Sequence, residues 1–115
     1  MDSEEMKLRP KHFAVNVAKL TLQLPDNLVN RIYKGQIIRS SSSAAANYRA
    51  SQRAKSKTDS INKRKIVEEE VDETLFVLEM LEVFNQNFAN EIKELYAEGE
   101  ILLKIIVASI VTSRQ

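Results

Sequence analysis

The 115-residue sequence contains no cysteine, one histidine, two glycines and two prolines. Without cysteine, the chain has no disulfide, zinc–thiolate site, iron–sulfur cluster or cysteine nucleophile. Glycine and proline are too scarce for a protein built from many short strands and turns, so a few long elements are expected. A chain without cysteine also fits the reducing cytoplasm, where we expect this protein to act.

Long apolar runs are also lacking. The most apolar stretch, residues 101–111, is interrupted by Lys104 and has about half of the ~20 residues needed to span a bilayer. Residues 1–10 are charged and lack the apolar run of a secretory signal. We therefore expect no membrane partner, a flexible lead-in over residues 1–10, and a single domain over residues 11–115.

Apolar residues recur at spacings of three and four along most of the chain, which is the pattern of amphipathic helices. The first expected helix begins at Lys11 and is ended by Pro25. Asp26 is the expected N-cap of a second helix, which extends from about Asn27 to about Lys55. Serine, threonine and aspartate in residues 56–59 are candidate caps for a third helix.

The same spacing predicts the hydrophobic core. The expected core residues are Phe13, Val17, Leu20 and Leu24 in the first helix, Ile61, Val67, Val71, Leu75, Leu78, Leu81 and Phe88 in the third, with Phe84 on its flank, and Ile92, Leu95, Leu102, Ile106 and Ile110 in a fourth helix that begins near Asn90. Short connections favour antiparallel neighbours, so we expect an all-α, up-down-up-down four-helix bundle. Because residues 101–111 are apolar nearly all round, this helix is also expected at a subunit interface.

Charge is distributed unevenly although the formal net charge is only +1. Residues 31–65 contain ten basic residues and one acidic residue, a net charge of +9. Residues 66–100 contain eleven acidic residues and one lysine, a net charge of −10. Such an asymmetry points to charged partners or to pairing between the two segments.

Four arginines of the second helix, Arg31, Arg39, Arg49 and Arg53, fall within a sector of about 80° on a wheel of ~100° per residue. Tyr33, Ile37, Ala44 and Tyr48 fall on the opposite side. A stripe of this kind suits phosphate backbones, and the expected phosphate contacts are Arg39, Arg49, Arg53, Lys57 and Lys63. The alternative is that these residues pair with acidic residues of the third helix, in the same or a neighbouring subunit.

Three segments resemble one bacterial family: RSSSSAAANYRASQRAKSK at residues 39–57, INKRKIVEEEVDETLFVLE at residues 61–79 and IIVASIVTSR at residues 105–114. The family is that of the four-helix bundle proteins, also called 23S ribosomal RNA intervening-sequence proteins. The resemblance implies a ring-like homo-oligomer, typically a pentamer. It also implies possible partners, since related proteins are accessory factors that bind a reverse transcriptase and nucleic acid.

Catalytic and metal sites are not expected. The acidic run at residues 68–73 could ligate a metal, but the Glu-x-x-His motif of di-iron bundles is absent and His12 is the only histidine. Ser40 to Ser43 offer hydroxyl groups without an adjacent base and an orienting third group. We expect no cofactor, and we expect the serines to lie at a helix–helix contact.

Three further residues allow two interpretations each. Asn47 is either a register-fixing amide at an interface or an ordinary exposed or capping amide. Tyr48 and Phe76 belong either to a subunit interface or to the core of one subunit.

The sequence therefore favours a non-catalytic oligomer that associates with RNA or DNA through its basic stripe. The alternative is a protein-binding adaptor or scaffold, for example for a reverse transcriptase, without direct contact to nucleic acid.

Overall fold

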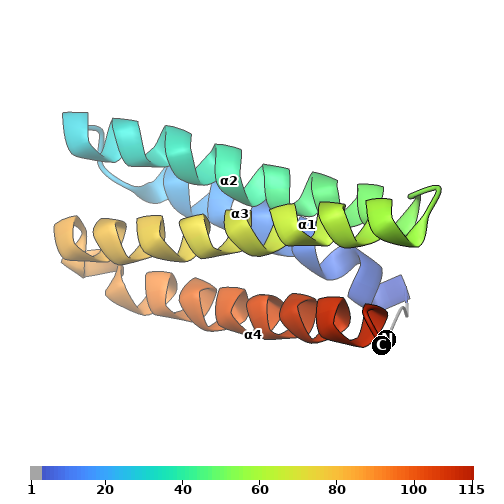
Figure 1. The fold of residues 1–115 in the computed structure, drawn as a ribbon. Coiled ribbons are helices and arrows are strands. Elements are labelled where there is room, and N and C mark those ends of the chain that lie inside the picture. The colour runs from blue at the N-terminus through green and yellow to red at the C-terminus, as the bar shows by residue number, and fades with distance from the viewer. Residues whose placement is uncertain (1–3) are drawn as a thin grey trace.

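The computed structural model describes residues 4–115 and is almost entirely helical (Figure 1). Its extents along the principal axes are 45 × 21 × 21 Å. The elements, in chain order, are α1 (Glu4–Gln23), α2 (Leu28–Gln52), α3 (Lys57–Phe84), the 3-10 helix η1 (Gln86–Phe88) and α4 (Ala89–Ser113). The prediction of an all-helical protein with four long helices is confirmed for these residues.

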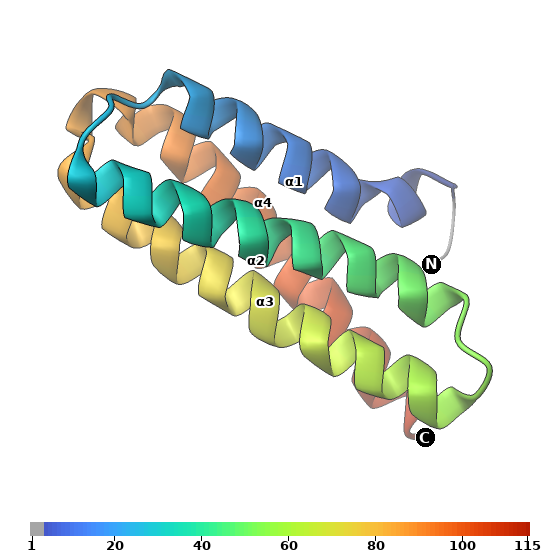
Figure 2. The ribbon, with the colours of Figure 1, turned by 90° about the horizontal axis from the view of Figure 1, so that it is seen from above.

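The four helices lie side by side along the long axis (Figures 1 and 2). α1 packs beside α2 and α4, and α3 packs beside the same two helices, so α1 and α3 occupy diagonal positions. Figure 1 shows that each connection turns the chain back along this axis, and that α1 and α3 run in the same direction.

The first helix begins at Glu4, seven residues before the expected Lys11, and Pro10 lies inside it. Proline in a helix interior removes one backbone hydrogen bond, which is why the sequence favoured a boundary there. Tertiary contacts of the residues before the proline outweigh this cost: Met6 packs against the core, and Arg9 bonds to Glu98 of α4. Residues 4–10 are therefore helix rather than lead-in, and residues 1–3 lie outside the described part of the chain.

The caps differ in one place from the expected ones. Asn27, not Asp26, is the N-cap of α2, because its side chain accepts a hydrogen bond of 2.8 Å from the Asn30 backbone N–H. α2 ends at Gln52, three residues before the expected Lys55. Ser56, one of the expected candidates, caps α3 by accepting a hydrogen bond of 3.1 Å from the Asp59 backbone N–H.

The core follows the predicted pattern closely. All four residues expected in the first helix are buried, although Leu24 lies directly after α1, as are five of the seven expected in the third helix and four of the five expected in α4. The exceptions, Ile61, Phe88 and Leu95, are half-buried, and Phe84 is 53% exposed.

No helix within residues 4–115 combines the length and the hydropathy that crossing a membrane requires.

A seam of buried polar side chains joins α2 to the end of α3. The amides of Asn30 and Asn85 donate to each other's side-chain oxygen at 2.8 Å in both directions. Asn30 also donates to the Pro25 carbonyl and Asn85 to the Leu81 carbonyl, each at 2.9 Å. Because both amides are buried and satisfied, the seam specifies one register of α2 against α3.

We expect Asn30→Leu to lower the free energy of unfolding by about 1–3 kcal/mol, because the amide of Asn85 would lose its side-chain partner while buried. Urea unfolding followed by circular dichroism measures this loss. Asn62→Leu, at an exposed asparagine of α3, is the control and should change the stability by less than about 0.5 kcal/mol. Equal stabilities of the Asn30→Leu variant and the wild type would contradict the role given to the seam.

The two glycines should respond oppositely to substitution. No atom lies within 4 Å of a Cβ added at Gly35, so Gly35→Ala should raise the free energy of unfolding by about 0.5–1 kcal/mol through helix propensity. A Cβ at Gly99 would lie 2.7 Å from Leu75 Cδ2 and 3.2 Å from Phe13 Cζ. Gly99→Val should therefore lower it by about 1–3 kcal/mol through overpacking. Both variants are compared at one protein concentration, since association shifts apparent stability.

Candidate nucleic-acid interface

The arginines of α2, and Arg53 directly after it, are exposed to solvent, as the helical wheel predicted. Arg31, Arg39, Arg49 and Arg53 are all exposed, whereas Ile37, Ala44 and Tyr48 are buried and Tyr33 is half-buried. The wheel therefore gave the correct orientation of α2.

Arg39 is held within the subunit by acidic residues of α3. Its guanidinium donates to Glu70 at 2.8 Å and also to Glu73. The hydrogen bonds to Glu73 and then Glu70 raise the pKa of Arg39. A phosphate would have to compete with two carboxylates for this guanidinium, so Arg39 is a weaker phosphate ligand than its exposure suggests.

The other four predicted contacts differ in their surroundings. Lys63 lies 3.8 Å from Asp59, one helical turn away on α3. Within residues 4–115, no carboxylate lies within ion-pairing distance of Arg49, Arg53 or Lys57. These three residues, together with the exposed Lys55, surround the connection between α2 and α3 and are here called the basic corner.

Two further arginines act within the fold. Arg9 donates to both carboxylate oxygens of Glu98, at 2.7 and 2.8 Å, and so ties α1 to α4. The hydrogen bond to Glu98 raises the pKa of Arg9. Arg64 donates to the Ser109 carbonyl at 3.0 Å and so links α3 to α4. Both guanidinium groups therefore join helices.

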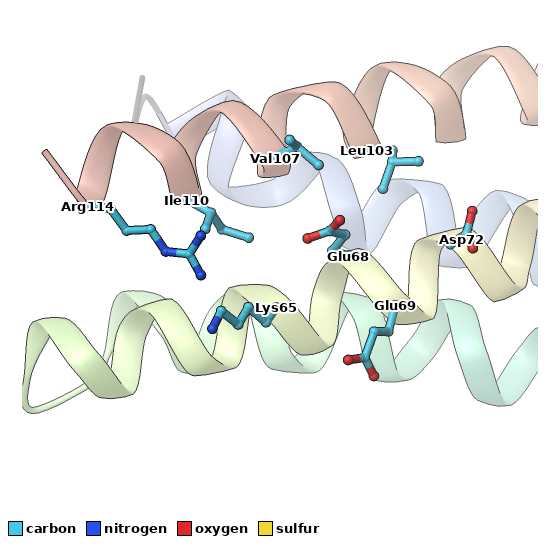
Figure 3. Close-up of a pocket in the computed structure, with 8 residues that line it drawn as sticks. All are labelled: Lys65, Glu68, Glu69, Asp72, Leu103, Val107, Ile110 and Arg114. Carbon is cyan, nitrogen blue, oxygen red and sulfur yellow. The ribbon is translucent and has the colours of Figure 1, made fainter.

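An open groove of about 500 Å³ lies between α3 and α4 (Figure 3). Leu103, Val107 and Ile110 of α4 line it, with Lys65 and Arg114 near one end. Its remaining lining residues are Glu68, Glu69 and Asp72. Three carboxylates beside two cations make this groove a poor phosphate site, so the basic corner is the better candidate.

The alternative chemistries find no support in the placement of their residues. Ser40 and Ser41 are buried: the Ser40 hydroxyl lies 2.7 Å from the Thr74 hydroxyl, and Ser41 donates to the Ile37 carbonyl. Ser40 thus lies at the α2–α3 contact, as expected, whereas Ser42 is exposed. His12 is exposed on α1.

The acidic run of α3 does not converge on one point. Glu70 and Glu73 bond to Arg39, while the carboxylates of Glu68 and Glu69 point in different directions (Figure 3). Within residues 4–115, no group of three or more histidine, aspartate or glutamate side chains could hold a metal ion.

The structure separates the three residues whose role was open. Asn47 donates to the Ser43 carbonyl at 2.9 Å within its own helix. Tyr48 is 4% exposed and belongs to the core of the subunit, whereas Phe76 is 56% exposed on α3. The sequence reasoning missed Asn30 and Asn85, whose spacing of 55 residues carries no local signal.

The fold and the exposed residues define a small all-α protein with four long helices. No family model and no curated protein matches the chain. The chain is similar to a solved structure of a protein of unknown function from the S23 ribosomal protein family of Bacteroides thetaiotaomicron VPI-5482, with a TM-score of 0.78 and 26% sequence identity. The match covers 90% of this chain and 96% of that chain. Membership of the intervening-sequence family stays a prediction.

The pairing pattern predicts different reactivities of the arginines. Phenylglyoxal should modify Arg49 and Arg53 faster than Arg39 and Arg9, because the latter two donate hydrogen bonds to carboxylates. Peptide mass spectrometry over a time course measures each rate. Glu70→Gln/Glu73→Gln should raise the rate at Arg39 alone, and an unchanged rate there would contradict the pairing.

Proposed function

We propose that this protein is a non-catalytic, nucleic-acid-associated accessory protein that binds RNA or DNA phosphates through the basic corner. The subunit is an antiparallel, up-down-up-down bundle, and copies of it form a ring-like homo-oligomer. The observation that carries the proposal is the set of four exposed cations at one connection, of which Arg49, Arg53 and Lys57 have no carboxylate partner within residues 4–115.

The physical basis is electrostatic. Cations that are already ion-paired gain little from a phosphate, whereas unpaired ones gain the full attraction and release the condensed counterions of the nucleic acid. Such contacts position a backbone and carry no base sequence. The proposed binding is therefore tolerant of sequence and sensitive to salt.

Assembly would strengthen a weak contact. Each subunit offers only a few phosphate ligands, and a ring repeats them around one axis, so that several corners can engage one nucleic acid. The similar structure belongs to a family named for a ribosomal protein, which agrees with an RNA partner, although that protein's own function is unknown.

The main test is binding of single-stranded RNA and duplex DNA across a salt series by fluorescence anisotropy. Arg49→Glu/Arg53→Glu should weaken binding at least about tenfold. It should also reduce the slope of log K against log salt by about two, since two phosphate contacts are lost.

Lys93→Glu/Lys104→Glu on α4 is the matched control, because it changes the net charge by the same amount away from the basic corner. It should bind nearly as well as the wild type. No binding by the wild type at low salt would overturn the proposal. The same corner would then be a docking site for an acidic protein surface, as in the adaptor alternative.

A further inference from the structure

The outer side of α1 exposes an apolar stripe that the fold of one subunit leaves uncovered. Leu8, Val15 and Leu22 are 44%, 43% and 86% exposed, and they recur at intervals of seven residues. The exposed Lys11 and Lys19 lie along the same side. A seven-residue interval keeps a straight stripe in contact with a second helix, as in coiled coils.

The outer side of α3 exposes a matching stripe with the opposite charge. Phe76 and Val83 are 56% and 63% exposed, again seven residues apart, and the half-buried Met80 lies between them. Glu69 and Asp72 extend this side toward the N-terminus of α3, and neither is ion-paired within residues 4–115. α1 thus offers apolar residues with lysines, and α3 offers apolar residues with carboxylates.

The two stripes lie at similar levels along the bundle. Phe13 of α1 and Leu75 of α3 both approach Gly99 of α4, so these two positions are level with each other. Leu8 and Val15 flank Phe13, and Phe76 adjoins Leu75, which brings the stripes into the same section. α1 and α3 also run in the same direction (Figure 1) and occupy diagonal positions in the bundle.

We propose that the α1 stripe of one copy packs against the α3 stripe of the next copy, and this inference rests on the oligomer of the proposed function. Charge complementarity selects a second copy as the occupant, because the stripe with lysines meets the stripe with carboxylates, and Lys11 lies level with Asp72. Pairing α1 with α1, or α3 with α3, would instead place like charges together. The contact is therefore heterologous, the kind that forms a ring when the rotation between copies closes.

The diagonal arrangement leaves the basic corner free. α2 and α4 flank the two stripes on either side, so Arg49 and Arg53 of α2 stay outside the contact. In a ring whose axis runs parallel to the bundle, rotation does not shift a copy along the axis. The two surfaces in contact must therefore lie at equal heights along the bundle, and the two stripes do. The assembly and the phosphate contact then use separate surfaces.

The first test uses mass measurement by light scattering after size exclusion. Leu8→Glu/Val15→Glu and Phe76→Lys/Val83→Lys should each reduce the wild-type oligomer to the 13.1 kDa subunit. All four residues are exposed, so circular dichroism should show unchanged helix content. Ile32→Glu/Ile38→Glu on α2, at residues 52% and 41% exposed, is the matched control and should keep the oligomer intact.

Cysteine cross-linking tests the direction of the contact, and the absence of native cysteine makes it clean. Leu22→Cys and Val83→Cys chains, co-expressed and oxidised, should form mixed disulfide dimers, because these two exposed positions lie level with each other, while either chain alone should not. Cross-linking of Leu22→Cys with itself would overturn the inference.

The outcomes separate this inference from the proposed function. A wild-type chain that stays at the subunit mass at all concentrations overturns the oligomer and this contact together. A wild-type oligomer unaffected by Leu8→Glu/Val15→Glu overturns the contact alone. In a third outcome, the mixed chains form disulfides while the oligomer binds no nucleic acid. That result would support the contact and overturn only the proposal that the basic corner binds phosphate.

Discussion

The reciprocal hydrogen bonds between the buried amides of Asn30 and Asn85 are the constraint on which the arrangement of α2 and α3 depends. Apolar side chains tolerate small shifts along a helix, whereas a buried amide loses its partner when the helices slide by one turn. The same register brings Ser40 to Thr74 and places Arg39 beside the carboxylates of α3. The seam therefore decides which surface cations are satisfied internally.

Some charged residues are paired within the subunit and others are not, although the two charged segments nearly balance in number. The basic and acidic segments partly neutralise each other across the α2–α3 contact, through the pairs of Arg39 with Glu70 and Glu73. The charged residues left unpaired include the cations of the basic corner and the carboxylates on the outer side of α3. We propose that the cations bind phosphate and that the carboxylates contact the side of α1 that carries lysines in a neighbouring copy.

Much of the fold could be predicted because helical periodicity is a local property. The buried face of α2, with Ile37, Ala44 and Tyr48, followed from the sequence, as did the position of Ser40 at the helix contact. The start of α1 did not, because Pro10 argued for a boundary and only contacts with α4 outweigh it. The N-cap of α2 was misplaced by one residue, since Asp26 and Asn27 are both good caps and geometry alone chooses between them.

The sequence by itself determined the helices, their buried faces and the exposure of the arginines, because each follows from residue types within a few turns. Only the tertiary structure decided that Arg39 is paired while Arg49, Arg53 and Lys57 are not. The partners of Arg39 lie 31 and 34 residues along the chain, so they depend on the register between two helices. The heights of the α1 and α3 stripes along the bundle also depend on tertiary structure. They are set by the packing of both helices against α4, which no local sequence pattern encodes.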